Sequence, residues 1–285
     1  MVAVTARTDR DLLLPDRVRP VGADRFVDVR GGAPAQAGTF AFDRSDSDEI
    51  VTGWHHHDMH QVEYALRGTV EVETRTAHYL LPPQQAVWIP AGLEHCTTIR
   101  RVSTVSVFFA PELVPDAGDR ARVLAAAPVV REMIVHAMRW PVWRTDPDPR
   151  ADTFFLALAG LVSDWLDHET PLRLPTSSDP LIAAAMAYTR EHLDDVTVVD
   201  VARAVGVSDR TLRRAFASTT GMSWRRYLLE ARLLRAMALL SGVSPSPTVL
   251  DVATEVGFES VSAFTRAFRA FVGEPPTAYR RRVTG

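Results

Sequence analysis

Between residues 198 and 282 the chain repeats one short pattern, and this repeat limits its possible folds more than any other feature of the sequence. Two positions of the first copy recur with a spacing of 51 residues, and five later positions recur with a spacing of 52. The matching pairs are Ala202 and Ala253, Gly206 and Gly257, Leu212 and Phe264, Arg214 and Arg266, Phe216 and Phe268, Gly221 and Gly273, and Tyr227 and Tyr279. A pattern that occurs twice in register indicates two copies of one structural unit.

Each copy has the layout of a helix-turn-helix unit. A short stretch with helical apolar spacing leads to a glycine, Gly206 or Gly257, where the chain can turn sharply. A serine follows, Ser208 or Ser260, and serine is a preferred N-cap for the next helix. The sequence therefore predicts two helix-turn-helix units, each with a second helix that has one apolar face.

The second helix of each unit leaves arginine and hydroxyl side chains outside its apolar stripe. Arginine can hydrogen-bond the edge of guanine with both arms or hold a phosphate, and serine and threonine suit either partner. On one isolated helix such arginines would most simply be solvated, but the doubled unit favours DNA contacts. The predicted DNA-binding residues are Arg210, Thr211, Arg213, Arg214, Ser262, Thr265, Arg266 and Arg269.

A third helix is predicted between the two units. The 19 residues from Ser223 to Ser241 carry apolar side chains at helical spacing and would span ~28 Å as a helix. Successive major-groove faces lie ~34 Å apart on one side of a duplex. A rod of this length could place the second helices of both units in adjacent grooves.

Two stretches resemble the DNA-binding domain of AraC/XylS-type transcription regulators. They are VARAVGVSDRTLRRAF at 201–216 and DVATEVGFESVSAFTRAFRAFVGEPPTAYRRR at 251–282. The resemblance implies that the helices after Gly206 and Gly257 both read double-stranded promoter DNA, and that RNA polymerase is a partner. Val261 stands where many relatives have a polar residue, so we expect no base contact from it.

The amino-terminal part of the chain is predicted to be a small barrel or jelly roll. Between residues 26 and 109, β-branched and aromatic segments with partial alternation are separated by Gly, Pro, Asp and Ser. No helix-length apolar pattern interrupts them. Several short strands in succession are typical of such barrels.

Two histidine motifs lie on these predicted strands. GWHHHDMHQ occupies 53–61 and PAGLEH occupies 90–95, and together they resemble the two motifs of the cupin family. Residues 81–95 are also similar to the sensor domain of a cupin-bearing branch of AraC-type regulators. Side chains alternate along a strand, so His55, His57 and Gln61 should face one side, and the resemblance implies that His95 joins them. The candidate effector or metal ligands are His55, His57, Gln61 and His95.

The chemistry of these four side chains leaves two interpretations open. Three neutral imidazoles and an amide oxygen suit one divalent Zn, Ni, Co, Cu or Fe ion and do not suit Ca or Mg. Gln61 stands where metal-binding cupins usually have glutamate, which removes a charged ligand. The alternative is a polar effector pocket that holds no metal.

Residues near the motifs are expected to serve mainly packing. We predict a core position for Tyr64 and a small core filler at Cys96. Trp54 and Trp88 are expected in the core, and the alternative is that either one stacks on an effector. Glu63 is either a carboxylate in the pocket or a charge at the rim of the barrel.

From residue 119 to 169 the apolar spacing becomes helical, and residues 151–168 form a broad stripe. This stripe packs either on the barrel or on a second copy of the chain, and the resemblance favours a homodimer. Residues 172–180 are rich in Pro and Ser and predict a linker. The predicted divisions are 1–115 for a cupin-like sensor barrel, 116–171 for a helical dimerisation segment, 172–180 for the linker and 181–285 for the double helix-turn-helix domain.

Composition agrees with this division. The net charge is −3, but arginines outnumber acids in residues 179–285 and acids outnumber arginines before them, which fits a DNA-binding half behind a half that does not touch DNA. One cysteine excludes an internal disulfide framework. No secretory core or run of 18 apolar residues occurs, so we expect a cytoplasmic protein without a membrane partner.

The sequence as a whole predicts an α+β protein of two domains. We expect a sequence-specific transcription regulator, not an enzyme, whose promoter binding responds to a metal or small molecule. Two alternatives stay open at this point: a cupin metalloenzyme of the oxygenase kind fused to a DNA-binding domain, and a DNA-binding protein whose barrel serves only for dimerisation.

Overall fold

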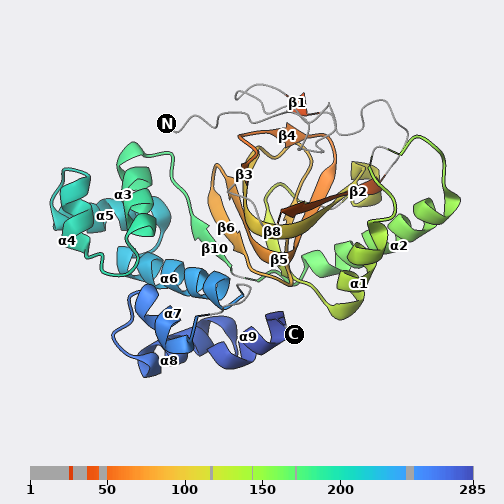
Figure 1. Ribbon diagram of the computed structural model, residues 1–285. Coiled ribbons are helices and arrows are strands. Elements are labelled where there is room, and N and C mark those ends of the chain that lie inside the picture. The colour runs from red at the N-terminus through yellow and green to blue at the C-terminus, as the bar shows by residue number, and fades with distance from the viewer. Residues whose placement is uncertain are drawn as a thin grey trace.

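The computed structural model describes residues 26–27, 37–44, 50–115, 118–142, 144–170, 172–241 and 247–284. Figure 1 shows an antiparallel sheet domain formed by the first half of the chain and a helical domain formed by the last third. The predicted two-domain organisation is therefore confirmed.

Eight strands of the described chain form one sheet. Their bounds are β2 Ala37–Arg44, β3 Ile50–Val51, β5 His60–Thr74, β6 Ala77–Leu81, β7 Gln85–Ile89, β8 His95–Phe109, β9 Arg122–Ala125 and β10 Arg173–Pro175. Two further short strands, β1 Phe26–Val27 and β4 His56–His57, pair with each other in parallel.

Strand β5 is the centre of the sheet because both of its ends have two neighbours. Gln61, near its start, pairs with Ile89 of β7 and with Phe108 of β8. Val70, in its second half, pairs with Leu81 of β6 and with β8. The register with β8 shifts between Ala65 and residue 69, and such irregularities bend a strand. The strands consequently curve around one another in Figure 1.

Two helices cover one side of the sheet domain: α1 Pro128–Ala137 and α2 Pro149–Leu166. Each begins with a proline at its first position, where the missing N–H costs nothing. The apolar stripe of α2 packs on strand residues, and this core includes Trp88, Phe109, Phe155, Leu158 and Val162. The stripe predicted for residues 151–168 therefore contacts the chain's own sheet.

The helical pattern predicted from residue 119 onward is wrong for Arg122–Ala125, which is strand β9. Val123 and Leu124 are both fully buried there, since β9 pairs with β7 while other parts of the chain cover its two faces. A strand that is buried on both faces has consecutive apolar residues, and over so short a run its pattern cannot be distinguished from that of a helix.

The segment predicted as a linker also contains a strand. Within 172–180, β10 pairs antiparallel with β6, and the N–H of Thr176 donates to the carbonyl of Thr76 at 3.2 Å. The described part of this segment is thus tied to the sheet domain along its first half.

Seven helices of the described chain form the carboxyl-terminal domain. They are α3 Pro180–Glu191, α4 Val198–Ala204, α5 Asp209–Thr220, α6 Trp224–Leu240, α7 Val249–Glu255, α8 Val261–Val272 and α9 Pro276–Thr284. Helices α4 and α5 form the first helix-turn-helix unit, and α7 and α8 form the second. Helix α6 joins the units and is capped by Ser223 at its start.

The end caps of the helices repeat as the sequence does. Helices α4 and α7 each begin with a capping box, in which a threonine and an aspartate three residues later satisfy each other's backbone N–H groups. The side chains of Ser208 and Ser260 cap α5 and α8, as predicted. Gly221 and Gly273 end these helices with φ of 72° and 90°, a region that glycine enters without steric cost.

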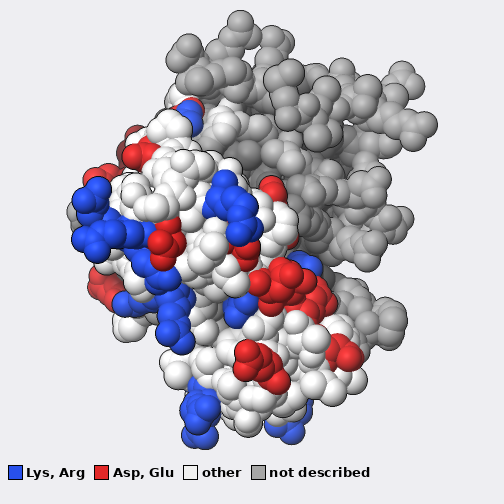
Figure 2. Space-filling model, turned by 90° about the vertical axis from the view of Figure 1, so that its left-hand side faces the viewer, with Lys and Arg blue, Asp and Glu red and all other residues white. Residues whose placement is uncertain are grey.

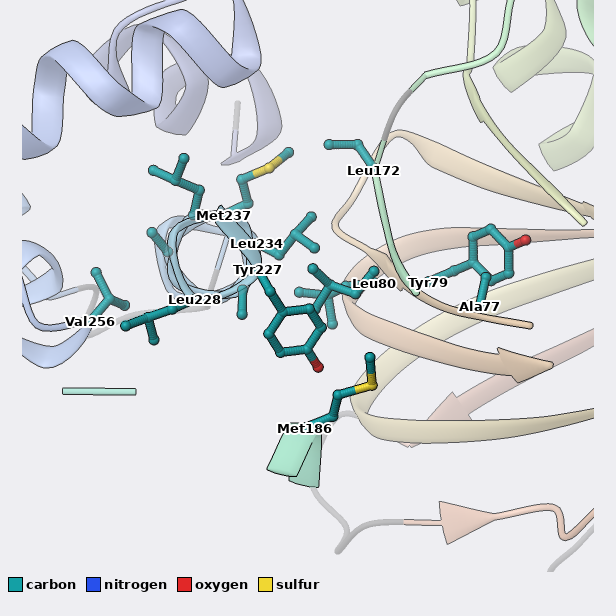
Figure 3. Packing of buried hydrophobic residues seen from close by; sticks show 14 of the residues in the cluster. Ala77, Tyr79, Leu80, Leu172, Met186, Tyr227, Leu228, Leu234, Met237 and Val256 are labelled. Atoms are coloured by element: carbon teal, nitrogen blue, oxygen red, sulfur yellow. The ribbon is translucent and has the colours of Figure 1, made fainter. Parts of the chain in front are cut away.

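Helix α6 also packs on the sheet domain, and one apolar core runs from β6 and β10 into the helical domain. Figure 3 shows Tyr227 and Leu234 of α6 facing Leu80 and Leu172 of the sheet domain, with Met186 of α3 beside them. The sheet and helical domains therefore share buried surface instead of being joined only by the chain.

A polar contact supplements this core at the hairpin between β6 and β7. The Gln84 side chain donates to the carbonyl of Arg282 at 2.8 Å and accepts from its guanidinium at 3.0 Å. Gln84 has φ of 67°, unusual for a residue other than glycine. Its backbone is held there because its N–H donates to Ala65 and its carbonyl accepts from Ala126.

The shared core predicts that the two domains unfold together. Replacing Leu80, 8% exposed, by Asp places an unpaired carboxylate between β6 and α6, which costs about 3–5 kcal/mol. We expect one cooperative urea transition for the wild-type chain and two separate transitions for Leu80→Asp, followed by circular dichroism and tryptophan fluorescence. Val51→Asp is the control, because Val51 is 42% exposed on β3. A single unshifted transition in Leu80→Asp would contradict the shared core.

Candidate functional site

The second helices of the two units expose the predicted DNA-binding residues. Leu212 and Phe216 of α5, and Phe264 and Phe268 of α8, are fully buried and fix which face of each helix points inward. The opposite faces carry six exposed side chains and two half-buried threonines. Exposed are Arg210, Arg213, Arg214, Ser262, Arg266 and Arg269, and half-buried are Thr211 and Thr265.

Most arginines on these faces are not engaged within the protein. Among the described residues, the side chains of Arg210, Arg214, Arg266 and Arg269 make no ion pair or hydrogen bond, and Arg213 has only a 3.8 Å contact with Asp209. Several other arginines of the domain are paired, as Arg226 is with Glu230 at 2.8 Å and Arg235 is with Glu255 at 3.2 Å. Figure 2 shows basic side chains in separate groups on the helix-turn-helix side of the molecule, with acidic ones between them. The free guanidinium groups are available to phosphates and base edges.

The predicted histidine cluster lies inside the sheet domain. The ring centroids of His55 and His95 are 4.3 Å apart, those of His57 and His95 are 5.2 Å apart, and those of His55 and His57 are 6.3 Å apart. An isolated bridge between His55 and His95 brings the two motifs together, with backbone hydrogen bonds of 2.9 and 2.8 Å. His57 and His95 are buried, and His55 is half-buried.

All three imidazoles are held in the same way. The Nδ1 atom of His55 lies 2.9 Å from the carbonyl of Gly53, that of His57 lies 2.6 Å from Met59, and that of His95 lies 2.9 Å from Leu93. A carbonyl only accepts, so Nδ1 carries the proton and Nε2 keeps its lone pair. The Nε2 of His95 is buried without a hydrogen-bond partner among the described residues.

Gln61 extends the cluster into the sheet. Its amide nitrogen donates to Glu63 and to the hydroxyl of Ser106, both at 3.0 Å, so its oxygen points to His57 Nε2 at 2.8 Å. Glu63 is 2% exposed and also accepts hydrogen bonds from the hydroxyls of Thr104 and Ser106. Glu63 is therefore a carboxyl group inside the domain and not a rim charge.

Burial controls the charge of these groups. It lowers the pKa of His57 to about 4, lowers that of His95 well below the ordinary range and also lowers that of His55. Repulsion between the neighbouring imidazoles acts in the same direction. Burial raises the pKa of Glu63, and the hydrogen bonds that it accepts oppose this shift. The three histidines are consequently neutral near pH 7, the form that coordinates metals.

This arrangement is not a closed metal site. Within the described ranges, no group of three or more His, Cys, Asp or Glu side chains stands ready to hold a metal ion. The three Nε2 lone pairs and the Gln61 oxygen form a patch of acceptors in a buried polar region. They are able to receive hydrogen-bond donors or a cation.

Other residues near the histidine cluster lie in the core or on its edge. Tyr64 and Trp88 are core residues, and His60 packs on Trp88 with 4.9 Å between ring centroids. Trp54 differs, since it is half-buried beneath the guanidinium of Arg75. Cys96 is half-buried.

Sequence reasoning missed Thr104 and Ser106, which hold Glu63. Thr104 and Ser106 alternate with apolar residues in STVSVFF, which indicates that they share one face of a strand, but this pattern does not show that Glu63 is their partner. That partner depends on the register of β8 with β5, in which Ser106 lies opposite Glu63 and Thr104 lies opposite Ala65.

Comparisons with known proteins decide the family. Residues 38–169 match the family described as "AraC-like ligand binding domain", and residues 201–282 match a "Helix-turn-helix domain" family. The chain belongs to the AraC-type transcription regulators. It is therefore a DNA-binding regulator with a ligand-binding domain, and not an enzyme.

The chain is similar to individual transcription regulators over different shares of its length. The HTH-type transcriptional regulator NimR of Escherichia coli K12 is 28% identical over 242 residues, which cover 84% of this chain and 85% of NimR. A putative AraC-like transcription regulator of Streptomyces lividans is 30% identical over 226 residues, 78% of this chain and 64% of that protein. The DNA-binding domain of the global transcriptional factor AdpA, crystallised with a target DNA, is 37% identical, with a TM-score of 0.33 over 37% of this chain and 93% of that one.

Helices long and apolar enough to cross a membrane do not occur in the part of this regulator that the structure describes.

The free arginines of α5 and α8 predict a mutational result. Arg214→Ala and Arg266→Ala should each weaken specific DNA binding by about 1–3 kcal/mol, because each removes a guanidinium group that can donate two hydrogen bonds to a base. Both side chains are exposed, so the fold should stay intact. Fluorescence anisotropy with a duplex selected by the wild-type protein measures the loss. Arg226→Ala is the control, because Arg226 is already paired with Glu230. Equal affinities for all four proteins would remove Arg214 and Arg266 from the DNA contacts.

Proposed function

We propose that this AraC-type regulator reads promoter DNA with α5 and α8 together, and that a ligand at the histidine cluster changes its promoter occupancy and so the access of RNA polymerase. In this proposal residues 1–115 form a cupin-like sensor and residues 116–171 a dimerisation segment. Residues 172–180 connect them to the DNA-binding domain at 181–285.

The contact between His57 and Gln61 carries the ligand proposal. Neutral His57 has one N–H, which donates to the carbonyl of Met59. The Nε2 lone pair therefore faces the Gln61 oxygen at 2.8 Å. Gln61 is held with its oxygen inward by Glu63 and Ser106. Two lone pairs at this distance repel unless a proton or a cation lies between them. Burial lowers the pKa of His57 and so disfavours a second proton on its ring. A bound cation or hydrogen-bond donor would instead relieve the repulsion between the two atoms.

The donor set favours a divalent transition metal: Zn, Ni, Co, Cu or Fe. His55, His57 and His95 offer Nε2, Gln61 offers an amide oxygen, and each Nδ1–H donates to a carbonyl, as in histidines that ligate metals. Such an ion would supply positive charge to the buried acceptors and draw the side chains together. A small organic molecule with hydrogen-bond donors is the second candidate, supported by the unclosed geometry.

The path from this ligand to DNA runs along β5. Its first residues include Gln61 and Glu63, and its second half pairs with β6, which packs on α6 between the two helix-turn-helix units. A ligand that binds one arrangement of sensor and α6 more tightly than another shifts the population toward it. DNA affinity then follows ligand occupancy.

Exposed apolar residues on α1 and α2 support a homodimer. Val129 is 57% exposed, Leu156 61% and Met138 40%, and a shallow apolar cavity of about 560 Å³ lies between the helices. Its lining is Pro128, Val129, Glu132, Met133, His136 and Phe154. Exposed apolar patches of this kind mark association surfaces.

Elemental analysis of tag-free protein after metal reconstitution tests the sensor. We expect near-stoichiometric transition metal in the wild type and none in His57→Ala, because His57 is buried beside the other two histidines and is the one that contacts Gln61. Operator affinity should change with metal in the wild type only. His168→Ala is the control, since His168 is exposed at the end of α2. If the wild type binds no metal and added metal does not change its operator affinity, a metal is excluded as the ligand of the histidine cluster.

Substitution on α2 tests the dimer. Leu156→Glu places a charge on the exposed apolar face, so sedimentation should show a shift from dimer to monomer without loss of helix content. Leu250→Glu is the matched control, because Leu250 is equally exposed, at 59%, but lies on α7. A dimer that persists in Leu156→Glu would mean that the chain pairs elsewhere.

A further inference from the structure

Arg232, in the middle of α6, reaches the turn that follows α3. Its Nε donates to the carbonyl of Leu193 at 2.7 Å and its Nη2 donates to the carbonyl of Asp194 at 3.2 Å. Both carbonyls lie beyond Glu191, the last residue of α3, in the turn that leads to α4. The guanidinium therefore holds this turn from a helix that lies 38 residues further along the chain.

Gly257, in the turn of the second helix-turn-helix unit, packs against the Asp194 carbonyl and the Arg232 guanidinium. A Cβ atom at this position would lie 2.1 Å from the Asp194 carbonyl oxygen and 2.5 Å from Arg232 Nη2. At Gly206, the equivalent position of the first unit, a Cβ would meet nothing within 4 Å. The two glycines have nearly the same φ, 73° and 77°. They share a backbone requirement, but only Gly257 is also needed for close packing.

This contact lies where the two units meet. Helix α3 packs on α4 and α5 of the first unit, Gly257 belongs to the second, and Arg232 comes from the helix that connects them. Further bonds hold α3 on α6, since Trp224 Nε1 donates to Thr189 at 3.0 Å and Arg190 donates to Tyr227 at 3.2 Å. On the other side, Arg235 of α6 pairs with Glu255 of α7 at 3.2 Å.

We propose that Arg232 and Gly257 form a joint that sets the relative placement of α5 and α8, and so the spacing between the two DNA segments that the regulator accepts. They are positioning residues, because neither lies on the faces that carry the predicted DNA contacts. The proposal rests on the proposed function, in which both helices read one duplex. Once α5 or α8 has bound its DNA segment, a rigid joint lets the other helix bind the same duplex only if the distance between the two segments matches the distance between the helices. The second binding event is then intramolecular and strengthens the complex.

The test uses the full chain and a duplex selected from a randomised library by the wild-type protein, in which a footprint defines the two contacted segments. Three further duplexes are compared: one with five base pairs inserted between the segments, which is about half a helical turn, and two that each keep one segment. The variants are Gly257→Ala, Arg232→Met and Gly206→Ala. Gly206→Ala carries the same backbone strain as Gly257→Ala without the clash. Arg232→Met removes the two hydrogen bonds to the turn without adding bulk, and circular dichroism checks each fold.

For the wild type we expect the insertion to weaken binding by about a hundredfold, within the usual gain from linking two contacts. Gly257→Ala and Arg232→Met should lose about tenfold or more on the intact duplex, bind the single-segment duplexes as the wild type does, and lose most of the spacing preference. Gly206→Ala should keep that preference. If Gly257→Ala matches Gly206→Ala, or if Arg232→Met keeps the full spacing preference, the joint is refuted. If the wild-type footprint covers one segment only, the two-helix reading itself fails, which is a separate result.

Discussion

Helix α6 is buried on several sides at once, and the packing of both domains relies on it. Its inward residues pack on both helix-turn-helix units and on strands β6 and β10, so one helix belongs to the cores of both domains. Apolar burial of this extent is the main favourable term in folding. A helix that is packed on three partners cannot shift against one of them without affecting the others. The sheet domain and the two helix-turn-helix units are therefore mechanically connected, and the polar contact between Gln84 and Arg282 lies at the edge of this connection.

The histidine cluster depends on a second constraint, which is the cost of burying polar groups. Glu63 is inside the domain only because Thr104, Ser106 and Gln61 donate to it, and Gln61 consequently turns its oxygen toward His57. The imidazoles lose their charge through burial and keep Nε2 lone pairs free. A domain whose buried hydrogen-bond acceptors lack donors should bind a ligand that supplies donors or positive charge. That is a chemical property expected of a ligand-binding domain.

The sequence predicted the features that local interactions determine. The serine caps at Ser208 and Ser260 and the joining helix from Ser223 to Ser241 lie where the sequence placed them, because caps, turns and apolar spacing act within a few residues. Features that depend on distant partners were not predictable. Strand β9 pairs with β7, β10 pairs with β6, and Arg232 donates to a turn carbonyl 39 residues earlier. Nothing in one stretch of sequence reports the register or the partner of another.

We propose that the sheet domain and the helix-turn-helix units are coupled through α6, and such coupling is reciprocal. Amide hydrogen exchange of the full chain, with and without a selected operator duplex, tests it without knowledge of the ligand. We expect DNA to change the protection of α5 and α8 and also that of β6 and the β6–β7 hairpin, which lie in the other domain. Changes confined to the helical domain would refute the coupling, because they would show that DNA binding leaves the sheet domain unaffected.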